Sequence, residues 1–186
     1  MTNTPFTFDS VQESKELSSF YRGMKIIDKD FDAIFFLEQV LHDSKEFTLC
    51  ILQYLESEYM RNGQLEIAEK FIRERINIMP NNAMCHMGLA SYLFYIKKEF
   101  QEALSVMDKA IFLAENDENL VIDAYTQKIN MYIAIKDKFS TENYLRKLID
   151  YVPKTNSINC NYDKNFVKSA LLIGVDSSLI NQYLAL

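Results

Sequence analysis

The sequence predicts an all-α protein made of about three tandem helical hairpins, with further helices before and after them. Residues 49–82 and 84–117 align 35 positions apart, and each stretch has two helical apolar patterns separated by a short polar turn. The 186 residues include only 4 glycines and 3 prolines, and strict alternation of β-branched residues is absent. So few helix breakers favour helices throughout the chain.

The first 48 residues are predicted to form an N-terminal tail followed by helices. Ser10 and Glu13 have the spacing of a capping box, which predicts a helix over about 11–27. Asp30 or Asp32 then caps a second helix. That helix carries an apolar stripe made of Phe35, Phe36, Val40 and Leu41. The stripe suits a dimer contact and a core position equally well.

Two hairpins follow with clear boundaries. Their helices are predicted over about 49–61 and 65–78, and over about 84–97 and 101–114. Gly63 suits the left-handed residue that ends a helix, and Pro80 stops the second helix.

A third hairpin is predicted over about 120–153, with helices over 120–135 and 141–151. Aligning it with the first two requires a turn that is one residue shorter, after which Pro153 falls where Pro80 falls in the first. The repeats therefore cover 49–153. Residues 154–186 are predicted as a loop and C-terminal capping helices, with Asp163 and Asp176 as helix caps, and all parts form one structural domain.

Composition excludes several classes of function. The net charge is −6 and no segment has clustered Lys and Arg, so nucleic acid and anionic membranes are poor partners. The apolar runs are far shorter than the ~20 residues of a membrane span, and no secretory signal is visible, which predicts a cytoplasmic protein. Cys50, Cys85 and Cys160 are widely spaced and odd in number, which favours reduced thiols.

The repeats resemble those of tetratricopeptide repeat proteins. The positions that carry this likeness are Leu55, Tyr59, Gly63, Ala68 and Pro80 in the first repeat, and Ala90, Ser91, Phe94, Phe100, Ala103 and Ala110 in the second. Glu56 and Arg75 depart from the family pattern, because their places are usually small or apolar. Their charges predict a local ion pair in the first hairpin.

A narrower likeness covers about residues 59–117, which resemble the class II chaperones of bacterial type III secretion systems. The residues that carry it are Asn62-Gly63, Ala68-Glu69, Phe71, Met87-Gly88-Leu89-Ala90, Phe100, Ala103 and Asn116-Asp117. The resemblance implies three repeats behind N-terminal helices that often mediate dimerisation. It also implies a concave groove that clamps an extended segment of a hydrophobic translocator client, in a bacterial cytoplasm.

The first helix of each hairpin is expected to line that groove, with side chains that recur three or four positions apart. The candidate groove residues are Gln53, Ser57, Met60, Arg61, Gly88, Tyr92, Tyr95, Ile96, Gln127 and Met131. Such a lining suits an apolar, extended peptide. The alternative for Tyr92 and Tyr95 is packing against neighbouring repeats. If they line the groove, replacing both with alanine abolishes client binding while the fold survives.

No catalytic, metal or cofactor site is predicted. Cys85 and His86 are adjacent on a helix, so their side chains diverge by roughly 100°, which is poor geometry for a nucleophile and its base. They are expected to be an ordinary thiol and a surface imidazole. The sequence therefore favours a client-binding chaperone that acts without ATP. The alternative is a structural adaptor that joins folded partners, and an enzyme is disfavoured.

Overall fold

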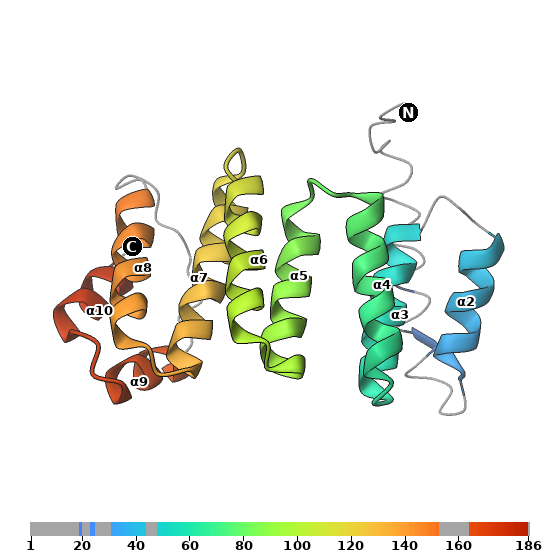
Figure 1. Ribbon diagram of the computed structural model, residues 1–186, viewed down its shortest axis with the longest axis horizontal. Helices are drawn as coiled ribbons and strands as arrows, with labels where there is room; N and C mark the ends of the chain where they lie inside the picture. The colour runs from blue at the N-terminus through green and yellow to red at the C-terminus, as the bar shows by residue number, and fades with distance from the viewer. Residues whose placement is uncertain (1–18, 20–22, 25–30, 44–47, 153–163, 186) are drawn as a thin grey trace. The chain divides into compact units, whose positions relative to one another are not determined.

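The computed structural model describes residues 19, 23–24, 31–43, 48–152 and 164–185 (Figure 1). Within these ranges the secondary structure is helical, with nine α-helices, one π-helical segment and no β-strand. The chain divides into two compact units, Met1–Pro80 and Asn81–Leu186. Residues predicted as one domain therefore belong to two units, and each is described by itself. In the described part of the chain, every helix is too short or too polar to cross a membrane.

The first unit contains α2 (Ala33–Asp43), α3 (Thr48–Arg61) and α4 (Leu65–Ile78). Asp32 caps α2, because its Oδ1 accepts a hydrogen bond from the backbone N–H of Phe35 at 3.0 Å. α3 packs against both α2 and α4. The predicted capping box and first helix lie for the most part outside the described residues.

The core of the first unit gathers apolar side chains from all three helices. Its buried members are Ala33, Leu37, Ile51, Leu55, Tyr59 and Ala68. Phe36, Val40 and Leu41 of the N-terminal stripe pack against this cluster, whereas Phe35 is exposed. Most of the stripe is therefore core, as one of the two alternatives predicted.

The turn between α3 and α4 contains Gly63, whose φ is +74°. The N–H of Gln64 bonds to the carbonyl of Tyr59 at 2.9 Å and satisfies an otherwise free helix-end group. The left-handed conformation predicted for Gly63 is confirmed. Helices α3 and α4 begin and end within one residue of the predicted bounds.

The second unit begins with α5 (Ala83–Tyr92), which continues as the π-helical segment η1 (Leu93–Lys97), and α6 (Phe100–Leu113) packs against both. The predicted single helix over 84–97 thus changes its winding after Tyr92. Lys98 ends η1 with φ +63°, at the place that Gly63 occupies in the first unit.

Helices α7 (Glu118–Ala134) and α8 (Lys138–Tyr151) form the next packed pair. The connection is residues 135–137, as long as the connection 62–64 between α3 and α4. The prediction of a shorter turn is therefore wrong. This pair differs from the first in the length of its first helix, because α7 has 17 residues and α3 has 14. Lys136, with φ +60°, is the left-handed residue of this turn.

The chain ends with α9 (Lys164–Leu172) and α10 (Ser177–Leu184), which contact α7 and α8 respectively. Ala170, Leu179 and Ile180 share one buried cluster with Ile129 and Leu145. The two C-terminal helices therefore bury apolar side chains of α7 and α8. Asp176 caps α10, as predicted, because its carboxylate accepts the N–H of Ser178 at 2.8 Å.

Candidate functional site

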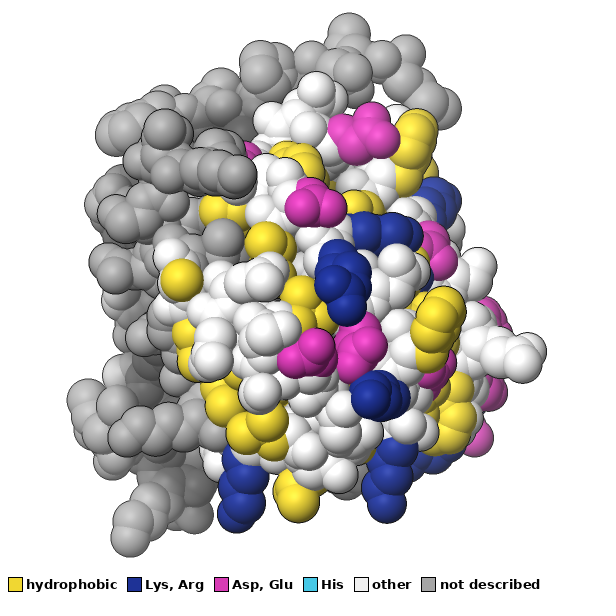
Figure 2. Space-filling view, turned by 90° about the vertical axis from the view of Figure 1, so that its left-hand side faces the viewer, with side chains coloured by type: hydrophobic (Ala, Val, Ile, Leu, Met, Phe, Trp, Pro, Cys, Tyr) yellow, Lys and Arg dark blue, Asp and Glu magenta, His cyan; other side chains and the backbone are white. Residues whose placement is uncertain are grey.

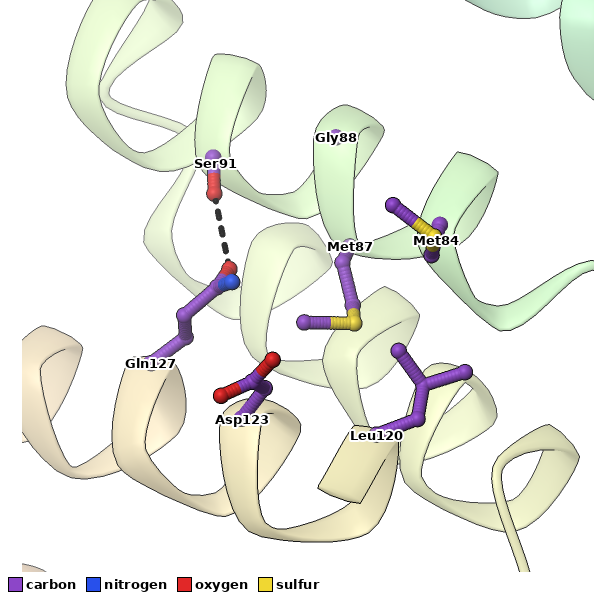
Figure 3. A pocket seen from close by; sticks show the side chains of 7 residues that line it. All are labelled: Met84, Met87, Gly88, Ser91, Leu120, Asp123 and Gln127. Atoms are coloured by element: carbon purple, nitrogen blue, oxygen red, sulfur yellow. Dashed lines mark hydrogen bonds between the residues drawn. The ribbon is translucent and has the colours of Figure 1, made fainter. Parts of the chain in front are cut away.

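A pocket of about 230 Å³ lies between α5 and α7 in the second unit (Figure 3). Four of its lining residues come from α5 and three from α7. They are Met84, Met87, Gly88 and Ser91, and Leu120, Asp123 and Gln127. Pockets for drug-sized ligands hold about 300–1,000 Å³. This pocket is therefore of a size for a single long side chain.

Helix periodicity explains why these residues meet. Members of each set recur three or four positions apart, which places them on one face of their helix. The start of each helix is fixed by a side-chain cap. The carboxamide of Asn82 accepts the N–H of Cys85 at 3.1 Å, and Asp117 accepts the N–H of Leu120 at 3.1 Å. The two caps therefore fix where each helix begins, and thereby which of its side chains reach the pocket.

Gly88 opens the α5 side of the pocket. A Cβ atom built on this residue meets no other atom within 4 Å. Glycine within a helix costs roughly 0.5–1 kcal/mol relative to alanine, and close packing here does not require it. The space beside Gly88 is thus available to a guest side chain.

The walls of the pocket are apolar and its polar groups are few. Met84 is 57% exposed, while Met87 is buried and Leu120 half-buried. The hydroxyl of Ser91 donates to Oε1 of Gln127 at 3.3 Å, which joins the two helices across the pocket (Figure 3). An apolar pocket with a few convergent polar groups is typical of a binding site.

Asp123 supplies the pocket's one charged lining group. Its side chain is exposed, and it makes no hydrogen bond or ion pair with other described residues. Asp123 and Gln127 lie one helical turn apart on α7, so their polar ends share one side of the pocket. This side therefore carries negative charge.

Of the candidate groove residues in the second unit, the structure brings Gly88 and Gln127 together in the pocket. Tyr95 and Ile96 are exposed on η1 and do not line it. Partial burial raises the pKa of the Tyr95 hydroxyl.

Two further candidates in the second unit are buried. Tyr92 and Met131 are 4% and 0% exposed, because they pack inside the helical layers. The burial of Tyr92 favours the alternative, packing against neighbouring repeats, over a place in the groove lining. The predicted Tyr92→Ala with Tyr95→Ala experiment would remove a core side chain, so it cannot separate binding from folding.

The remaining candidates lie on α3 in the first unit. Gln53 is exposed, and its backbone carbonyl accepts a hydrogen bond from the Ser57 hydroxyl at 3.0 Å. Met60 packs partly against the core, and the exposed Arg61 pairs with the buried Glu58 on its own helix. These four residues share α3 in the first unit, whereas the pocket belongs to the second unit.

Sequence reasoning missed five lining residues, which are Met84, Met87, Ser91, Leu120 and Asp123. A usable signal was present. Met84 precedes Gly88 by four positions, and Asp123 precedes Gln127 by four, which is one helical turn in each case. Met87 and Ser91 entered the sequence analysis as residues that carry the family resemblances, and not as groove residues.

Cys85 and His86 are both buried at 4% exposure. The prediction of a surface imidazole is wrong, because α5 buries side chains on several sides. Among the residues that the structure describes, no group of three His, Cys, Asp or Glu side chains is placed to hold a metal ion.

Comparisons with known proteins assign no family to this architecture. No protein-family model matches the chain, and no curated protein matches it.

Proposed function

We propose that the chain is a protein-binding chaperone of the tetratricopeptide type, which holds an extended apolar segment of another polypeptide. The observation that carries the proposal is the pocket between α5 and α7, where Met84, Met87 and Leu120 form apolar walls beside open space at Gly88. Methionine adapts to side chains of different shape, which suits the capture of an unfolded segment.

The hairpin pattern supports the tetratricopeptide assignment. Ala68, Ala103 and Thr141 are fully buried at equivalent places in α4, α6 and α8. Each lies five residues after the left-handed turn residue of its hairpin, which is Gly63, Lys98 or Lys136. Small residues at these places allow two helices to approach closely, as the family requires.

The proposed client is a type III secretion translocator or a related secreted protein held in the bacterial cytoplasm before export. This part rests on the resemblance of residues 59–117 to class II secretion chaperones. The mechanism is stoichiometric burial of an apolar segment, which keeps that segment from aggregating. A homodimer formed through the N-terminal helices belongs to the same proposal.

Gly88→Leu tests the role of the pocket. The new side chain enters open space, so the helix is retained while the pocket is filled. Losing one buried apolar contact of about 1.5–3 kcal/mol lowers client affinity about 10- to 150-fold. The client's solubility on co-expression and its recovery with the purified chain are measured, and circular dichroism checks the fold.

Ser105→Leu is the matched control, since it adds the same side chain at an exposed position of α6 outside the pocket. It is expected to recover the client as the unchanged chain does. Equal recovery with Gly88→Leu would exclude the pocket from client binding.

A structural adaptor is the second candidate. It is favoured by strongly exposed apolar side chains outside the pocket, above all Phe139 on α8 and Leu172 on α9. On the face shown in Figure 2, apolar side chains lie among Lys, Arg, Asp and Glu groups, a mixture that suits a folded, soluble partner. The same co-purification separates the candidates, because an adaptor recovers partners that are soluble without it.

A further inference from the structure

We infer that the α5–α7 pocket takes a long basic side chain, lysine or arginine, from the bound segment. The inference rests on the proposed function and specifies what its pocket recognises. Among the lining residues there is one carboxylate, on Asp123, and no cationic group. That carboxylate has no ionic partner among the described residues, so its charge is available to a guest.

The arrangement of the pocket matches the two parts of such a side chain. Met84, Met87 and Leu120 present apolar surface for a hydrocarbon stem. Asp123 is exposed, so a charged head beside it stays in contact with water. Lysine and arginine prefer this placement, with the stem along apolar surface and the head solvated.

Gln127 adds a neutral acceptor on the same side. Its Oε1 already accepts the Ser91 hydroxyl at 3.3 Å, and a carbonyl oxygen has a second lone pair. A cationic head can therefore donate to both Asp123 and Gln127, which lie one helical turn apart. A guest carboxylate would meet the Asp123 charge at close range and is rejected.

The test uses five-residue peptides, blocked at both ends, with alanine and leucine around one central position. That position is lysine, arginine, norleucine or glutamate. Norleucine has the lysine chain without the ammonium group, so the pair isolates the charge. Binding is followed through the NMR signals of the Met84 and Met87 methyl groups, in protein labelled at methionine. The buried Met107 on α6, outside the pocket, is an internal control.

The lysine and arginine peptides are expected to bind about three- to fivefold more tightly than norleucine at low salt, the size of an exposed ion pair. Glutamate binds most weakly. The advantage of lysine decreases at high salt, because exposed charges are screened. Asp123→Asn is expected to remove the difference between lysine and norleucine. Asp150→Asn, an exposed carboxylate on α8, is expected to keep it.

Norleucine binding as tightly as lysine, or a preference that survives Asp123→Asn, would overturn the inference and leave the apolar pocket of the proposed function intact. Methionine signals that stay fixed with every peptide would overturn it as well. The proposed function fails separately, when Gly88→Leu leaves client recovery unchanged.

Discussion

Glu56 and Arg75 form an ion pair between α3 and α4 in which both side chains are about one-tenth exposed, with 2.8 Å between Oε2 and Nη1. Both places are usually small or apolar in the resembled family, and the sequence alone predicted the pair. Burial raises the pKa of the Glu56 carboxyl, although the Arg75 guanidinium opposes this. The desolvation cost at Glu56 is therefore only partly offset. Nε of Arg75 is also buried, and it has no hydrogen-bond partner among the described residues.

We predict that breaking this pair costs far more than replacing it. Arg75→Met leaves a buried carboxylate unpaired and is expected to lower the free energy of unfolding by about 3 kcal/mol. The double variant Glu56→Met with Arg75→Met removes both charges at similar volume, and is expected to be at least as stable as the unchanged chain. Chemical denaturation of the single and double variants measures the coupling. A double variant that is as destabilised as Arg75→Met alone would contradict the argument.

The sequence predicted the helices far better than the pocket. Local sequence signals, or contacts within one hairpin, determine the features that were predicted correctly. These are the helix bounds, the left-handed Gly63, the Asp176 cap and the Glu56–Arg75 pair. Predicting the groove residues required knowing which side of α5 is exposed. That side is not evident from the sequence, because α5 buries the nearly consecutive residues Met87, Leu89 and Ala90. A helix that is apolar on several sides has no periodic signal for its exposed face.

Lys128 shows the same limit for a polar residue. It lies on α7 with 1% of its side chain exposed, and its Nζ donates to Oδ1 of Asp108 and to the carbonyl of Leu104 at 3.4 Å. The ammonium group also lies 4.6 Å from the ring centroid of Tyr144 on α8. These partners come from two other helices, so the sequence near Lys128 does not predict its burial.

We predict unequal losses of stability from removing the two members of this pair. Lys128→Met keeps the stem and leaves Asp108, which is 59% exposed, in contact with water, so the free energy of unfolding changes by less than about 1 kcal/mol. Asp108→Ala leaves the buried ammonium without its carboxylate and costs about 2 kcal/mol. Thermal unfolding measures both, with Asp150→Ala as the control for an exposed carboxylate. Equal losses from Lys128→Met and Asp108→Ala would be inconsistent with this asymmetry.

Alkaline pH is predicted to destabilise the protein through two tyrosines. Burial raises the pKa of Tyr59 to about 12, reinforced by its hydrogen bond to Glu38. Burial likewise raises the pKa of Tyr144 to about 12, together with the charge and hydrogen bond of Asp108. In the unfolded chain both hydroxyls ionise near the ordinary tyrosine pKa of 10.

The two raised pKa values determine the direction in which stability changes with pH. A raised folded-state pKa means that unfolding releases protons above pH 10, so stability is full below about pH 10 and is lost as pH rises towards 12. Tyr144→Phe and Tyr59→Phe each remove one ionising group and are expected to flatten this loss. Denaturation at a series of alkaline pH values measures the slope. An unchanged slope in both variants would exclude these tyrosines as its source.

Replacing glycine with alanine is predicted to have opposite effects on stability at a left-handed turn and inside a helix. Gly63 has φ +74°, and a Cβ added there meets no atom within 4 Å, so Gly63→Ala is opposed by backbone strain alone. We expect a loss of about 1 kcal/mol. Gly88 lies inside α5 with equally open surroundings, so Gly88→Ala is expected to gain about 0.5–1 kcal/mol in helix propensity.

Lys136 is a non-glycine residue in the strained left-handed conformation, with φ +60°. Lys136→Gly relieves this strain and is expected to raise the free energy of unfolding by about 0.5 kcal/mol, after the greater entropy of glycine in the unfolded chain is subtracted. Urea denaturation of the three variants measures these changes, and a stabilised Gly63→Ala would show that this turn is not left-handed in solution.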